Sequence, residues 1–132
     1  MNKVSGNAIS WEVKDGVIEL ALHREPCNEL GTQSLGEFEK FIAALPELEE
    51  HSHALIIYSQ VNSGFSAGAD LRETYRRTQD MEKDAAAASI RESLERTHRT
   101  CRVTAEAADP ALYRLREQGP EHRRRRIAQE RG

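Results

Sequence analysis

The sequence predicts an α/β fold, because two apolar strands, an amphipathic helix and a third apolar strand follow one another along the chain. The first two strands are expected at residues 9–12 and 17–22, around a hairpin turn made by Asp15 and Gly16. The third is expected at residues 54–58, where the run Ala-Leu-Ile-Ile-Tyr indicates a buried strand. This order is the beginning of an α/β unit.

The helix between the second and third strands is predicted from an apolar stripe at helical spacing. Its members are Leu35, Phe38, Phe41, Ile42 and Leu45. Thr32 or Ser34 is expected to cap its beginning, and Pro46 is expected to end it.

A turn of small residues follows the third strand. It runs from Phe65 to Leu71, and a charged, helix-favouring stretch begins at Arg72. Gly68 lies between Ala67 and Ala69, so a ligand can come close to the main-chain N–H groups. With the positive end of the following helix, these N–H groups can hold a negative oxygen, as in an oxyanion hole.

Three segments together resemble the crotonase superfamily, which contains the enoyl-CoA hydratases and isomerases. They are residues 15–20 (Asp-Gly-Val-Ile-Glu-Leu), 24–30 (Arg-Glu-Pro-Cys-Asn-Glu-Leu) and 64–71 (Gly-Phe-Ser-Ala-Gly-Ala-Asp-Leu). Their order, and roughly their spacing, is that of the family, and the resemblance covers about residues 9–99. It implies the first turn or turns of a crotonase-like ββα spiral, truncated.

The resemblance also implies an acyl-CoA site. The Ala69 backbone N–H, beside Gly68, would polarise the thioester carbonyl. The implied positions of CoA contact are Arg24, Ala67, Ala69, Asp70 and Leu71. The CoA thioester would be the substrate, with no separate cofactor and no metal. An ordinary surface role for Arg24 stays open, and Asn28 is expected to order its own turn.

The chain is expected to have three parts: an α/β core at 1–80, a helix over the acyl pocket at 81–99, and a helical, weakly structured Arg-rich tail at 100–132. Residues 1–98 hold 10 Lys and Arg against 17 Asp and Glu, whereas the remainder holds nine Arg, no Lys and five acids. Our hypothesis for this change is a reading-frame shift in a GC-rich gene. Translating the coding DNA in all three frames around codon 98 tests that hypothesis.

The family's second half supplies a glycine-rich loop with another oxyanion N–H, and the acids that move protons. No Gly-Gly pair occurs in this chain. Losing one oxyanion donor costs about 2.7–4 kcal/mol, and losing the acid/base about 10²–10⁴-fold in rate. The chain alone is therefore expected to be inactive. The alternative to an acyl-CoA enzyme is a catalytically inactive remnant or an interaction module.

Other functions are weaker candidates. Residues 64–68 also fit the G-x-S-x-G elbow of serine hydrolases, with Ser66 as nucleophile, but residues 60–63 separate Ser66 from its strand. His51 and His53 lack a third metal ligand. The Arg run at 123–126 has no interleaved aromatic residues, so nucleic-acid binding is not favoured.

The remaining expectations concern compartment and assembly. Cys27 and Cys101 give no disulfide framework, and no apolar run approaches the roughly 20 residues of a membrane span. A cytoplasmic protein with free thiols and no membrane contact is expected. Strand edges left open by a half spiral predict a homo-oligomer or aggregate.

Overall fold

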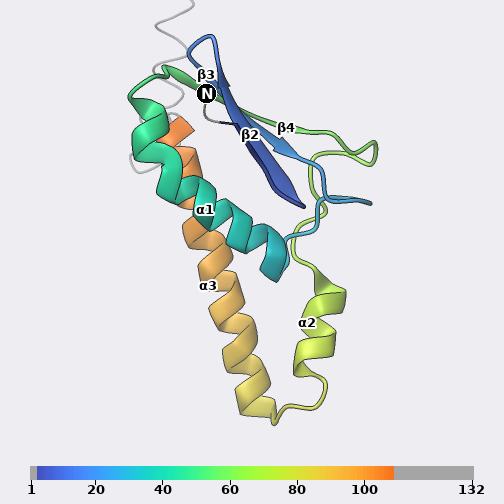
Figure 1. Cartoon of the computed structure of the whole chain (residues 1–132). Coiled ribbons are helices and arrows are strands. Elements are labelled where there is room, and N and C mark those ends of the chain that lie inside the picture. Colours follow the sequence, from blue (N-terminus) through green and yellow to red (C-terminus); the bar gives the residue numbers. More distant parts are fainter. Residues whose placement is uncertain (1–2, 109–132) are drawn as a thin grey trace, which may run out of the picture.

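The computed structural model describes residues 3–108, which form a mixed four-stranded sheet with helices on one face (Figure 1). The strands are β1 (Lys3–Ser5), β2 (Ile9–Lys14), β3 (Val17–Leu22) and β4 (Ala54–Ser59). Their order in the sheet is β1-β2-β3-β4; β1, β2 and β3 are antiparallel, and β4 runs parallel to β3. The predicted α/β class is confirmed.

The hairpin between β2 and β3 has the predicted turn. Asp15 and Gly16 have φ of 51° and 76°, the left-handed conformations that a tight two-residue turn requires. β2 continues past the expected end to Lys14, which pairs with Val17. The three-residue β1 was not predicted, because it is too short to show a period.

Helix α1 (Thr32–Glu49) packs its apolar stripe on the sheet. Phe41 is fully buried at 0% exposure, and its ring meets Trp11 of β2 edge-on, with centroids 5.4 Å apart. Each side chain of such a core contributes about 1.5–3 kcal/mol through burial. The stripe predicted from the sequence is therefore the helix face that closes the core.

Both predicted ends of α1 need correction. The N-cap is Gly31, and Ser34 lies inside the first turn, where its Oγ accepts from the Gly31 N–H at 2.9 Å. Thr32 is the first helical residue. Pro46 lies within the helix instead of ending it. A proline removes one N–H, but burial of Leu48 at 2% exposure favours the last turn.

The expectation that β4 is a buried strand is wrong. Its residues alternate between exposed and half-buried, with Ile56 51% and Tyr58 37% exposed. Leu55 and Ile57 point to the other side and pack against the core. The helices of the described region lie on that side only (Figure 1). Only one face of β4 is therefore covered, although its residues are apolar on both faces.

Two further helices follow. Helix α2 (Leu71–Thr78) begins one residue before Arg72, where the helix-favouring stretch was expected to start, and α3 (Lys83–Ala108) follows a short turn. α3 passes residue 100 without a break, and Thr100 and Thr104 are buried on successive turns. The first part of the predicted weakly structured tail is thus helical, while the Arg run at 123–126 lies outside the described residues. None of the described helices is long and apolar enough to cross a membrane.

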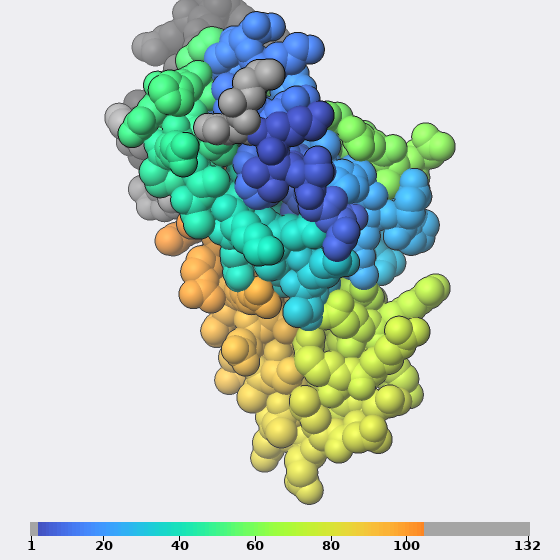
Figure 2. Space-filling model, in the orientation of Figure 1, coloured from blue at the N-terminus to red at the C-terminus, as the bar shows by residue number. Residues whose placement is uncertain are grey.

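Figure 2 shows α2 and the N-terminal half of α3 projecting beyond the end of the sheet. This part has few buried residues, and no residue of α2 is buried. Its exposed large apolar side chains are Leu71, Tyr75, Met81, Ile90 and Leu94. An ion pair from Arg96 of α3 to Glu39 of α1, at 2.8 Å between Nη2 and Oε2, helps to hold α3 against the core.

Candidate functional site

The turn between β3 and α1 is organised by Asn28, which is buried and has a φ of 50°. Its Oδ1 accepts from the Arg24 N–H at 2.8 Å, and its own N–H donates to the Arg24 carbonyl at 2.8 Å. Asn tolerates the left-handed conformation better than most residues. The expectation that Asn28 orders its own turn is confirmed.

Asn28 also fixes the loop that follows β4. Its Nδ2 donates to Ser59 Oγ at 2.9 Å and to the Phe65 carbonyl at 3.0 Å. In return, Ser66 Oγ donates to the Asn28 carbonyl at 2.7 Å. One buried amide therefore joins the end of β4 to the small-residue turn, a link that the sequence did not reveal.

The small-residue turn is held to Leu30 by two backbone hydrogen bonds. The Leu30 N–H donates to the Gly68 carbonyl at 2.7 Å, and the Asp70 N–H donates to the Leu30 carbonyl at 3.0 Å. Ala69 lies between them, exposed, and its N–H has no acceptor among the described residues. Gly68 has a φ of 86°, which a side chain would strain.

Asp70 caps α2 and pairs with Arg24. Its Oδ1 accepts from the Glu73 N–H at 3.0 Å, and its Oδ2 accepts from Arg24 Nη2 at 2.7 Å. These two bonds, the Glu73 N–H first and Arg24 second, lower the pKa of the Asp70 carboxyl. Arg24 Nη1 donates to the Glu29 carbonyl at 2.6 Å. Two residues expected to contact CoA thus bind one another.

Beside this turn lies a groove of about 120 Å³ between α2, α3 and the start of α1. Ala69, Asp70 and Leu71, three of the predicted site residues, line it. Its apolar walls come from Leu30, Leu35, Leu71, Ile90 and Leu94. Ala67 and Arg24 are not among its lining residues.

The charged side chains of the groove already have partners. Glu73 accepts from the Thr32 N–H at 2.9 Å and lies 3.8 Å from Arg77. Arg77 in turn donates to Ser89 Oγ at 3.1 Å and to Ser93 Oγ at 2.8 Å. This chain of contacts ties α1, α2 and α3 together around the groove.

The structure gives the serine-hydrolase alternative no support. Ser66 Oγ donates to a backbone carbonyl and accepts from the Gly68 N–H at 3.1 Å, and β4 ends at Ser59, well before Ser66. Cys27 is no better a nucleophile. Its Sγ donates to the Glu29 carboxylate at 3.3 Å, and this bond raises the pKa of the thiol.

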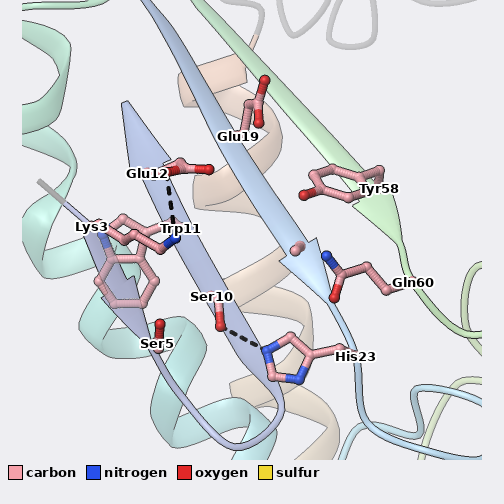
Figure 3. Close-up of a pocket in the computed structure, with 10 residues that line it drawn as sticks. Lys3, Ser5, Ser10, Trp11, Glu12, Glu19, His23, Tyr58 and Gln60 are labelled. Atoms are coloured by element: carbon pink, nitrogen blue, oxygen red, sulfur yellow. Dashed lines mark hydrogen bonds and ion pairs between the residues drawn. The ribbon is translucent and has the colours of Figure 1, made fainter. Parts of the chain in front are cut away.

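A second, larger cavity of about 330 Å³ lies on the face of the sheet opposite the helices (Figure 3). Its polar lining includes Ser10 and His23, whose Oγ and Nε2 are 2.7 Å apart. Glu12 stands directly opposite Glu19 in the sheet and lies 3.8 Å from Lys3. The sequence did not reveal this cavity, because its residues come together only when four strands pair.

In the part of the chain that the structure describes, no three His, Cys, Asp or Glu side chains are grouped so that they could hold a metal ion. His53 instead lies beside Gly16, whose carbonyl accepts its N–H at 2.9 Å.

The fold is similar to that of solved enoyl-CoA hydratases. A proposed enoyl-CoA hydratase from Streptomyces coelicolor A3(2) matches 78% of this chain with 22% identity and a TM-score of 0.60. An enoyl-CoA hydratase from Bacillus anthracis matches 74% with 23% identity and a TM-score of 0.59. DspI from Pseudomonas aeruginosa matches 71% with 22% identity and a TM-score of 0.55. No family model matches the chain, and no curated protein does.

The match covers 36%, 35% and 34% of those three chains, so this chain spans about a third of their length. The likeness confirms the predicted fold: the chain carries part of the crotonase fold and fits its N-terminal portion.

Proposed function

We propose that the Gly68–Ala69 turn and the adjoining groove bind the thioester end of an acyl-CoA. The observation that carries this proposal is the N–H of Ala69, an exposed residue that lines the apolar groove just before the N-cap of α2. This N–H has no acceptor in residues 3–108. The thioester carbonyl oxygen accepts this N–H, and the N-terminal end of α2 favours the negative charge that develops there.

The groove suits the rest of the ligand. The acyl chain lies along the apolar walls made by Leu35, Ile90 and Leu94. Arg24 is committed to Asp70, so it is a poor choice for the CoA phosphates. Arg72, exposed in the first turn of α2, takes that role in the proposal.

We propose further that binding is not followed by turnover in this chain, as in a catalytically inactive remnant. The groove-lining carboxylates of Asp70 and Glu73 are both engaged in hydrogen bonds, and the lowered pKa of Asp70 makes it a poor proton donor. A single oxyanion donor also leaves about 2.7–4 kcal/mol of transition-state stabilisation unsupplied.

Calorimetric titration of the full chain with butyryl-CoA tests binding. Ala69→Pro removes the N–H, and the expected loss is about 2- to 10-fold in affinity, the value of a neutral hydrogen bond of about 0.5–1.5 kcal/mol. Ala69→Gly is the matched control, because it keeps the N–H and should bind like the parent. Equal affinity of all three proteins, with folding checked by circular dichroism, would remove Ala69 from the proposal.

The phosphate contact is tested separately. Arg72→Gln should lower the affinity for butyryl-CoA. It should not change the affinity for butyryl-pantetheine, which lacks the nucleotide phosphates. Turnover is followed as loss of crotonyl-CoA absorbance. A loss would contradict the inactive remnant but not binding, whereas absence of butyryl-CoA binding would contradict the acyl-CoA site itself.

A further inference from the structure

The outer edge of β4 has no strand beside it in the part of the chain that the structure describes. β4 pairs along its whole length with β3, from Val17 opposite Ala54 to Leu22 opposite Ser59. Its other edge ends the sheet. The N–H and C=O groups of an edge strand offer a template for another strand.

This edge lacks the features that keep edge strands apart. From Ala54 to Ser59 it has no charged residue and no proline. The opposite edge is different, because β1 has only three residues and begins with Lys3. Short strands and charged side chains, lysine above all, are the usual protection against edge pairing.

We propose that β4 pairs antiparallel with β4 of a second copy of this chain, across a two-fold axis. Ile56 then faces Ile56 of the second copy, Ala54 lies opposite Tyr58, and Leu55 lies opposite Ile57. Each pair keeps its side chains on one face, as directly opposed residues must. No like charges meet at this contact, because β4 carries no charged residue.

The pairing covers apolar surface as well as backbone. Ile56 and Tyr58 are 51% and 37% exposed on the helix-free face, and the second copy brings the same two side chains alongside. α1 and α3 lie on the opposite face (Figure 1), so they do not stand in front of these residues. Each chain has one β4, and the contact therefore closes at two copies.

Light scattering with size exclusion, on the full chain, should give a mass of about twice 14.9 kDa. Ile56→Lys puts two charges opposite each other at the axis, and the mass should fall to that of one chain. Val4→Lys is the matched control, since Val4 is 42% exposed on β1, and it should stay dimeric. Circular dichroism checks that both variants fold.

Crosslinking provides a second test. Its result decides the proposal if the Ile56→Lys variant does not fold or does not become monomeric. Ile56→Cys, with Cys27→Ser and Cys101→Ser, should form a disulfide dimer on mild oxidation, because directly opposed Cβ atoms come to about 4.5 Å, which is the upper end of the range that a disulfide spans. Val4→Cys in the same background should not. A parent chain that is monomeric, including one whose own residues cover the edge, or that forms larger assemblies overturns the proposal. So does a dimer without the Ile56→Cys crosslink.

Discussion

The Arg24 guanidinium donates to the Asp70 carboxylate across 46 residues of sequence, with 2.7 Å between Nη2 and Oδ2. The Asp70 side chain is 8% exposed and that of Arg24 is 28% exposed. Because Asp70 is also the N-cap of α2, this pair joins the turn after β3 to the helix that forms one wall of the groove. The pair positions the Ala69 N–H, whose residue directly precedes Asp70.

Arg24→Met should lower the free energy of unfolding by about 2 kcal/mol, because a buried carboxylate loses a charged hydrogen-bond partner. Urea denaturation measures this. Asp70→Asn keeps a good N-cap and supplies the other arm of a double-mutant cycle. The two substitutions should be less than additive, and strict additivity would contradict a direct interaction.

Stability should fall in acid. The pKa of Asp70 is lowered from 3.8 by the Glu73 N–H and Arg24; that of Glu37 is lowered from 4.5 because three N–H bonds outweigh the effect of burial. A lowered folded-state pKa gives stability that is complete above the ordinary value and is lost as pH falls through the folded-state pKa. The free energy of unfolding, measured by urea denaturation, should therefore fall progressively below about pH 4. An Asp70→Asn chain should show a flatter acid limb, and an unchanged slope would contradict the assignment.

Asn28→Ala should destabilise the chain by about 3 kcal/mol, because it removes the bonds to Ser59 and Phe65 and places alanine at positive φ. Asn28→Gly loses the same bonds without the backbone strain, so it should be more stable than the alanine variant by about 1 kcal/mol. Thermal and urea unfolding compare the two. Equal stabilities would show that the backbone conformation costs nothing here.

Glu37 of α1 should stabilise the connection between β1 and β2. Its two carboxylate oxygens accept the N–H groups of Asn7, Ala8 and Ile9, each at 2.8 Å. Glu37→Ala should cost about 3 kcal/mol by leaving these donors unpaired. Glu37→Gln keeps one acceptor and should cost about half as much. Amide exchange of Ala8 should speed up in both variants, and protection that stays unchanged would contradict the role.

Local patterns gave the right answer where the cause is local. The hairpin follows from two adjacent residues, Asp15 and Gly16, that adopt left-handed conformations, and α1 follows from the spacing of its apolar stripe. Gly68, which the sequence singled out for close approach of a ligand to the backbone, has a φ of 86° in the structure. The end of α1 was missed because Pro46 is a local signal, whereas the helix continues so that Leu48 can pack into a core made by segments distant in the sequence.

Contacts between distant segments were beyond such patterns. Nothing near Arg24 in the sequence indicates that its partner is Asp70, and Glu37 reads as an ordinary charged residue on a helix. The exposure of β4 was missed for the same reason. Its apolar residues suit a strand covered on both sides, and only the placement of the helices shows that one side is open.

The two backbone hydrogen bonds on either side of Ala69 allow opening of this turn to be followed by hydrogen exchange. The Leu30 and Asp70 amide protons are held by backbone hydrogen bonds, whereas the amide proton of the exposed residue Ala69 has no acceptor among residues 3–108. In deuterated water the Ala69 amide signal should therefore disappear before those of Leu30 and Asp70. The exchange rates of the Leu30 and Asp70 protons report how often the turn opens. A ligand that accepts a hydrogen bond from the Ala69 N–H slows the exchange of that proton alone. Ligand binding can therefore be distinguished from a general loss of flexibility in the turn, which would slow all three protons.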